Sequence, residues 1–150
     1  MGPNFMLRLL VALDLSDCSR LALASALMVA RHAPTEIVVL SVLERAGSPT
    51  EERLNESEQL VTALHRMVQS VLDEAHGGKA PEGAKVHYSV VRGSAPDEII
   101  AQALAHHADT IVIGTHGRRG LDRLLTGSVA ERVVRNAPCS VFTVKPKRTA

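Results

Sequence analysis

Apolar residues along the chain fall into five short runs, separated by stretches in which apolar positions recur every three or four residues. Residues 7–14 and 36–43 are almost continuously apolar, as expected of strands that are covered on both faces of a sheet. Residues 85–91 mix polar and apolar positions, which places that strand nearer an edge. Residues 110–114 and 140–144 are short and rich in β-branched side chains. The pattern therefore predicts five strands.

Helical spacing of apolar residues predicts a helix between each pair of strands. Residues 19–33 are rich in Ala and Leu, and Pro34 closes this segment. Residues 51–76 carry Leu and Val at three-, four- or seven-residue spacings, which form one face of a helix. The other two helices are expected at residues 94–107 and 128–136.

Three of these helices begin with the pattern of a capping box. In this motif a Ser side chain and an acidic side chain three positions later each accept a hydrogen bond from the other's backbone amide. The pairs are Ser48 and Glu51, Ser94 and Asp97, and Ser128 and Glu131.

Strict alternation of strand and helix predicts a single-domain α/β fold of the Rossmann-like kind. We expect an open five-stranded parallel sheet in the order 3-2-1-4-5, with helices on both faces. One domain spans residues 1–150, with its core at about 7–145, because 150 residues suffice for one hydrophobic core. The sequence shows no second domain, internal repeat or low-complexity tract.

Composition excludes several classes of function. The net charge of +1 and the 2% aromatic content do not suit nucleic-acid binding, which needs basic residues for phosphates and rings for stacking. No apolar run approaches the ~20 residues of a membrane helix, and no signal peptide is indicated, so we expect a cytoplasmic protein. The two cysteines, Cys18 and Cys139, match no metal or redox motif, and Cys139 is expected to pack as a small hydrophobe.

The connection from Gly114 to Ser128 is the strongest candidate for a binding site. Ligands of open parallel sheets bind beyond the carboxyl ends of the strands, and βα connections usually take only about two to six residues. Gly114 and Gly117 allow the backbone to approach a ligand closely. Gly127 and Ser128 lie where a helix begins, and the free amides and dipole of that end favour an anion. The residues thus predict an anion site.

The spacing Gly114-x2-Gly117-x9-Gly127-Ser128 resembles the signature of the ATP-binding branch of the universal stress proteins. Residues 11–19, 91–100 and 136–145 also resemble this family's first strand ending, its third helix entry and its closing strand. Leu15 occupies a place where many members have Gly, and Ser140 replaces the second Pro of the closing motif.

The resemblance implies an adenine nucleotide, ATP with Mg²⁺, lying across the switch between the first and fourth strands. By similarity, Ala12 and Asp14 contact the adenosine part and Val42 meets the adenine edge through its backbone. The residues implied around the ribose and phosphates are Gly114, His116, Gly117, Gly127, Ser128 and Val129. It also implies a homodimer through the last strand, by Val141, Phe142, Thr143 and Val144.

Other interpretations remain open for these residues. Asp14 could simply cap the turn after the first strand, and His116 could make a polar contact without acting as a base. The absence of a Gly-Lys-Ser/Thr motif favours a nucleotide-dependent regulatory switch with slow or no hydrolysis. The alternatives are a weak ATPase and a partner-binding stress module. A phosphate-accepting receiver domain is disfavoured because the third strand ends in Val91-Arg92-Gly93, without an acid.

Overall fold

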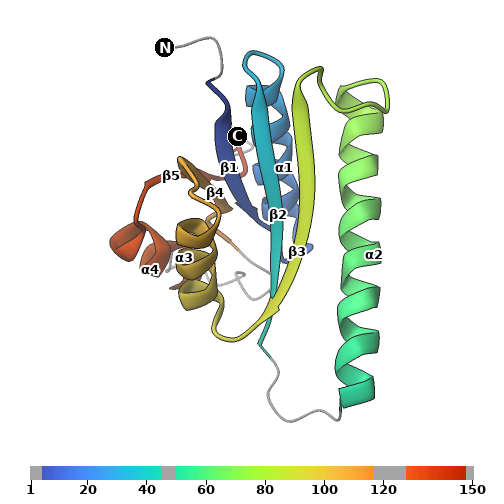
Figure 1. Ribbon diagram of the computed structural model, residues 1–150. Helices are drawn as coiled ribbons and strands as arrows, with labels where there is room; N and C mark the ends of the chain where they lie inside the picture. Colours follow the sequence, from blue (N-terminus) through green and yellow to red (C-terminus); the bar gives the residue numbers. More distant parts are fainter. Residues whose placement is uncertain (1–4, 45–49, 117–127, 148–150) are drawn as a thin grey trace.

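The computed structural model describes residues 5–44, 50–116 and 128–147 (Figure 1). Within these ranges five strands alternate with four helices, as the sequence predicts. The elements are β1 (Leu7–Ala12), α1 (Asp17–Ala30), β2 (Thr35–Leu43), α2 (Thr50–Ala75), β3 (Ala84–Arg92), α3 (Ala95–Ala105), β4 (Thr110–Gly114), α4 (Ser128–Asn136) and β5 (Ser140–Val144).

All strand pairs of the sheet are parallel, and the strand order is β3-β2-β1-β4-β5, which confirms the predicted topology. β1 lies at the centre, where Leu10 pairs in register with Val38 of β2 and Ile111 of β4. Leu10 and Ile111 are completely buried. β1 is nearly continuously apolar because helices cover both faces of a central strand.

Helices cover the two faces of the sheet in pairs, and each pair builds its own apolar cluster. Side chains on a strand point alternately to the two faces, so neighbouring residues of β1 contribute to different clusters. α1 and α2 pack with Leu9 and Val11 in one cluster, and α3 and α4 pack with Leu10 in the other. Figure 1 shows α3 in front of the sheet beside β4, with α4 to the left of α3.

The prediction for α1, residues 19–33, was wrong by two or three residues at each end. The helix begins at Asp17 because the side chain of Ser16 caps it, its Oγ accepting the amide hydrogen of Ser19 at 3.1 Å. It ends at Ala30, well before Pro34, and the amide of Arg31 turns back to the carbonyl of Met28 at 3.2 Å.

The predicted capping box at Ser94 was also wrong. Ser94 is the N-cap of α3, but its side chain accepts no cap hydrogen bond. Instead, Oε1 of Glu44, just beyond β2, accepts the amide hydrogen of Ala95 at 3.1 Å. A carboxylate at this position also interacts favourably with the positive end of the helix dipole. Ser48 and the side chain of Ser128 lie outside the described residues.

Substitution of Glu44 is therefore expected to matter more than substitution of the N-cap serine. We expect Glu44→Ala to lower the free energy of unfolding by about 1 kcal/mol, because the amide of Ala95 loses its acceptor and the helix dipole loses a favourable charge. Ser94→Ala removes no such bond and serves as the matched control. Equilibrium urea unfolding of both variants measures the difference, and a larger loss in Ser94→Ala than in Glu44→Ala contradicts this account of the cap.

β3 forms one edge of the sheet, as its mixed sequence predicts. On the α2 side the ring of Tyr88 stacks on His65, with ring centroids 3.7 Å apart and an angle of 19° between the planes. Burial raises the pKa of the Tyr88 hydroxyl above its usual value, so this side chain stays neutral in the folded protein.

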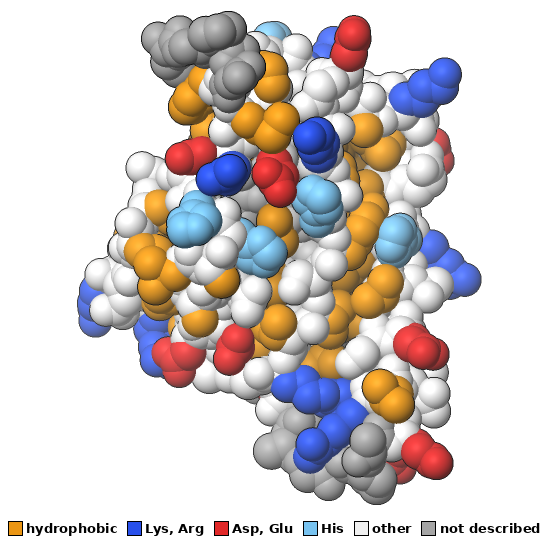
Figure 2. All heavy atoms as spheres, in the orientation of Figure 1, with side chains coloured by type: hydrophobic (Ala, Val, Ile, Leu, Met, Phe, Trp, Pro, Cys, Tyr) orange, Lys and Arg blue, Asp and Glu red, His pale blue; other side chains and the backbone are white. Residues whose placement is uncertain are grey.

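Charged residues are interspersed on the face of the molecule shown in Figure 2. Glu36 of β2 lies 3.8 Å from the Arg8 side chain of β1 and 3.4 Å from the His87 side chain of β3. Such surface pairs contribute little to stability.

Candidate functional site

The carboxyl ends of β1 and β4 lie side by side at the centre of the sheet. Ala12, the last residue of β1, pairs in register with Leu40 of β2 and Ile113 of β4, and Gly114 follows Ile113 directly. The chain order reverses between β1 and β4, and at such a switch point the connections leave a crevice. The fold therefore brings Ala12 and Gly114 together where the sequence predicts a ligand.

Three of the predicted site residues share the α3/α4 side of the sheet. Ala12 of β1, Val42 of β2 and Val129 of α4 are all partly buried, and all pack against the same apolar cluster. Val42 lies two residues beyond Leu40, the partner of Ala12. Residues from three separate segments thus border the same apolar cluster on that side of the sheet.

Asp14 caps the turn that follows β1, which was its alternative role. Its Oδ1 accepts the amide hydrogen of Ser16 at 3.0 Å, and the side chain is exposed. This hydrogen bond holds Asp14 just beyond the carboxyl end of β1. A nucleotide contact of Asp14 stays a prediction.

Leu15 adopts a backbone conformation that favours glycine. Its φ of 65° lies in the left-handed region, where a side chain costs about 1–2 kcal/mol. The side chain is half-buried and packs against the α1/α2 cluster. Leu15, which stands where many family members have Gly, therefore strains this turn. Its apolar contacts offset part of the strain energy of the backbone.

Two substitutions separate the strain of Leu15 from its packing. Leu15→Ala keeps the left-handed strain and loses the apolar contacts, so its free energy of unfolding is expected to fall below that of the wild type. Leu15→Gly loses the same contacts but relieves the strain, and it is expected to be about 1 kcal/mol more stable than Leu15→Ala. Chemical unfolding tests this order. If Leu15→Ala is as stable as Leu15→Gly, the backbone at this position is not strained.

Gly114 is required by packing, a role that sequence reasoning missed. A Cβ on this residue would meet Cys18 at 2.8 Å from Sγ, 2.9 Å from the carbonyl carbon and 3.0 Å from the carbonyl oxygen. The first turn of α1 therefore lies directly against the end of β4. No local pattern reveals this contact, because the two residues are far apart in the sequence.

The carbonyl of Val144, at the end of β5, joins three segments beside Gly114. It accepts hydrogen bonds from the amide of Thr115 at 3.0 Å, the hydroxyl of Thr115 at 3.4 Å and the thiol of Cys18 at 3.3 Å. The Thr115 oxygen also lies 2.9 Å from Nδ1 of His116. Cys18 and Thr115 are buried, and neither was identified from the sequence as a site residue. The Thr115 hydroxyl thus links His116, a predicted site residue, to the end of β5.

The remaining predicted site residues are only partly described. α4 begins at Ser128 as predicted, but Gly117, Gly127 and the side chain of Ser128 lie outside the described residues. Within the described part of the chain, no three acidic, His or Cys side chains are grouped to hold a metal ion. No described helix combines the length and apolar character of a membrane span.

Cys139 packs as the small hydrophobe that the sequence predicts. It is partly buried against the α3/α4 cluster and forms no disulfide. Burial, reinforced by the charge of Asp109, raises the pKa of its thiol, although a backbone hydrogen bond at Ile111 opposes the shift. A thiol with a raised pKa is a poor nucleophile.

These features define an open, doubly wound α/β protein whose strand order reverses between β1 and β4, the place where such sheets bind ligands. Comparison with known proteins identifies the family. The model of the universal stress protein family matches residues 6–145, and the chain belongs to that family.

Relatives resemble the chain over nearly its whole length. Universal stress protein MJ0531 of Methanocaldococcus jannaschii is 34% identical over 98% of this chain and 87% of its own. The structure of UspA from Lactobacillus plantarum has a TM-score of 0.75 at 24% identity, covering 92% of this chain and 97% of that one. A universal stress protein from Archaeoglobus fulgidus in complex with dAMP has a TM-score of 0.65 at 25% identity, covering 94% and 98%.

Proposed function

We propose that this universal stress protein binds ATP with Mg²⁺ in the crevice between β1 and β4 and acts as a nucleotide-dependent switch in a stress response. The observation that carries the proposal is the convergence of Ala12, Val42 and Val129 on one side of the sheet, beside Gly114 at the switch point. Apolar side chains on this side of the sheet suit contact with the flat face of a base. The dAMP complex of the Archaeoglobus relative supports an adenine ligand.

The phosphates would lie against the segment that carries the glycine signature. Gly117, Gly127 and Ser128 would surround them, with the amino end of α4 supplying free amides and a favourable dipole. Mg²⁺, when bound, offsets the charge of the phosphates. It is typically held through phosphate oxygens and water with few protein ligands, which fits the described residues, where no acidic cluster is present.

We expect the bound nucleotide to be hydrolysed slowly or not at all. Hydrolysis needs a base that positions water at the γ-phosphate. The sequence has no Gly-Lys-Ser/Thr motif of the kind that positions phosphates for transfer, and His116 is expected to make a polar contact instead of acting as a base. A weak ATPase and a stress module that acts through a protein partner are the alternatives.

A second copy of the chain is the expected partner. β5 is an edge strand that carries Val141, Phe142, Thr143 and Val144, and Phe142 is exposed. An apolar edge is protected when it pairs with another strand. The proposal therefore includes a homodimer through β5, in the cytoplasm.

Mass spectrometry of ligands released from the purified protein tests the proposal. The expected result is a retained adenine nucleotide, with ATP predominant, or uptake of added ATP with a raised melting temperature. Absence of retained nucleotide together with no response to added ATP contradicts the proposed function.

A further inference from the structure

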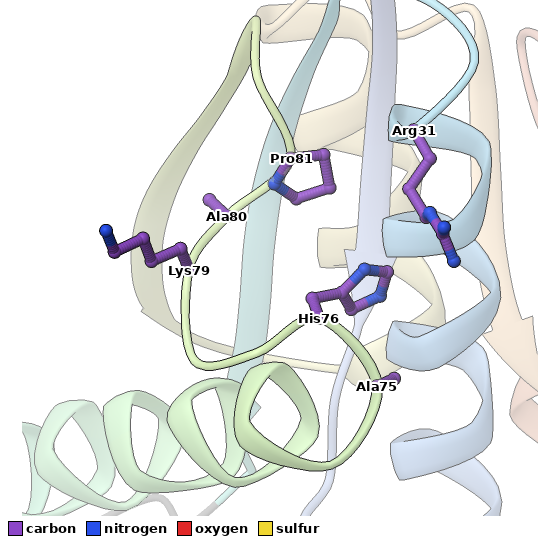
Figure 3. A pocket seen from close by; sticks show the side chains of 6 residues that line it. All are labelled: Arg31, Ala75, His76, Lys79, Ala80 and Pro81. Carbon is purple, nitrogen blue, oxygen red and sulfur yellow. The ribbon is translucent and has the colours of Figure 1, made fainter.

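A cavity of about 340 Å³ lies at the opposite end of the sheet from the nucleotide crevice. Its walls come from the end of α1, the end of α2 and the loop that leads into β3 (Figure 3). The lining residues are Arg31, Ala75, His76, Lys79, Ala80 and Pro81. Three of the six can carry positive charge, and none is acidic.

The basic groups of this cavity have no partners of their own within the described chain. No hydrogen bond or ion pair joins the side chain of Arg31, His76 or Lys79 to another described residue. The acidic residues nearest His76 in sequence have other partners than the three basic side chains. Asp73 accepts a hydrogen bond from Gln69 at 2.8 Å, and Glu74 pairs with Arg20 at 2.6 Å.

Figure 3 shows how the side chains are arranged. Arg31 extends from α1, and His76 extends from the loop into the gap between that loop and α1. Lys79 projects outward from the loop, so it adds charge near the cavity without lining its centre. A ligand in the gap would therefore contact mainly the guanidinium and the imidazole.

The backbone around the cavity is fixed by hydrogen bonds. The amide of Gly78 donates to the carbonyl of Leu72 at 2.9 Å, which ends α2 with a left-handed glycine. The amide of Ala84 donates to Pro81 at 3.0 Å. The Gly77 position is open, because a Cβ there would meet no atom within 4 Å. The cavity is thus preformed and open to solvent.

We propose that this cavity binds the phosphate group of a small molecule. A guanidinium presents paired donors that match two phosphate oxygens, and the imidazole supplies a further donor. The carboxyl ends of α1 and α2 also lie here, and their dipoles oppose an anion. The expected affinity is therefore weak, with a Kd of about 1 mM for phosphate. This site is separate from the nucleotide crevice and does not depend on it.

NMR titration of the nucleotide-free protein with inorganic phosphate, against chloride at equal ionic strength, tests the site. Saturable shifts are expected for the His76 ring and the Arg31 side chain, and acetate is expected to bind more weakly. Arg31→Gln should weaken binding about tenfold, and Lys79→Gln should weaken it less. Arg66→Gln, an exposed arginine of α2 outside the cavity, removes the same charge as a matched control and should leave binding unchanged.

Several results would overturn the proposal. Diffuse attraction of anions would give shifts that do not saturate, or shifts that acetate produces equally well. It would also weaken phosphate binding as much in Arg66→Gln as in Arg31→Gln. Gly127→Val separates the two sites, because the phosphate shifts of His76 should persist in this variant whether or not it binds ATP. Loss of those shifts in Gly127→Val would also contradict a separate site.

Discussion

Gly114→Ala is expected to lower the free energy of unfolding by about 2 kcal/mol, the range of overpacked sites. The added Cβ would lie 2.8–3.0 Å from Sγ, the carbonyl carbon and the carbonyl oxygen of Cys18. Two of these atoms belong to the backbone of α1, which cannot move without disturbing the first turn of the helix. Gly114 does not have a left-handed φ, so the effect is steric rather than conformational.

Equilibrium unfolding in urea measures this effect, and a second variant shows its origin. Cys18→Ala combined with Gly114→Ala removes the clash with Sγ but keeps the close contacts with the backbone of Cys18. The alanine at position 114 should therefore cost less in the Cys18→Ala background, yet still destabilise the protein. An alanine at 114 that changes stability by less than about 0.5 kcal/mol would show that α1 does not pack as described.

Gly127→Val is expected to weaken ATP binding by about 10- to 100-fold, from a steric cost of about 1–3 kcal/mol. The glycine signature predicts that the backbone at this position approaches the phosphates, and a branched side chain would occupy that space. Calorimetric titration of ATP into the variant measures the loss.

Ala101→Val provides the matched control for this substitution. Ala101 is exposed on α3, so the variant adds bulk at a surface outside the glycine signature. It should bind ATP as the wild type does. Wild-type affinity in Gly127→Val, with both variants folded, would mean that the nucleotide site lies elsewhere.

The order of elements and the sheet topology could be predicted from the sequence, because they follow from periodic local patterns. The continuous apolar run of β1 predicts that this strand is buried on both faces. The polar residues of β3 predict that this strand lies at an edge of the sheet. Parallel connection rules then leave few possible strand orders. Helix ends were less predictable, since α1 stops at Ala30 although Pro34 suggests an end at residue 33.

What could not be predicted depends on contacts between distant segments. Ser94 has the sequence of a helix cap, but Glu44 from another element makes the hydrogen bond. Gly114 suggests close approach to a ligand, whereas the structure places the first turn of α1 against it. For Leu15, the sequence shows only that Leu stands where many family members have Gly, and its left-handed φ is known from the structure. The contacts of Ser94 and Gly114 could not be predicted without knowing where the other segment lies.

Calorimetric titration of ATP in the presence of Mg²⁺ tests the central claim most directly. The Arg31→Gln variant is titrated alongside the wild type, because its weakened phosphate binding at the cavity near Arg31 and His76 keeps that cavity from contributing to the signal. We predict saturable binding of one nucleotide per chain in both proteins, competed by dAMP. Folded protein that shows no saturable binding of ATP would contradict the account.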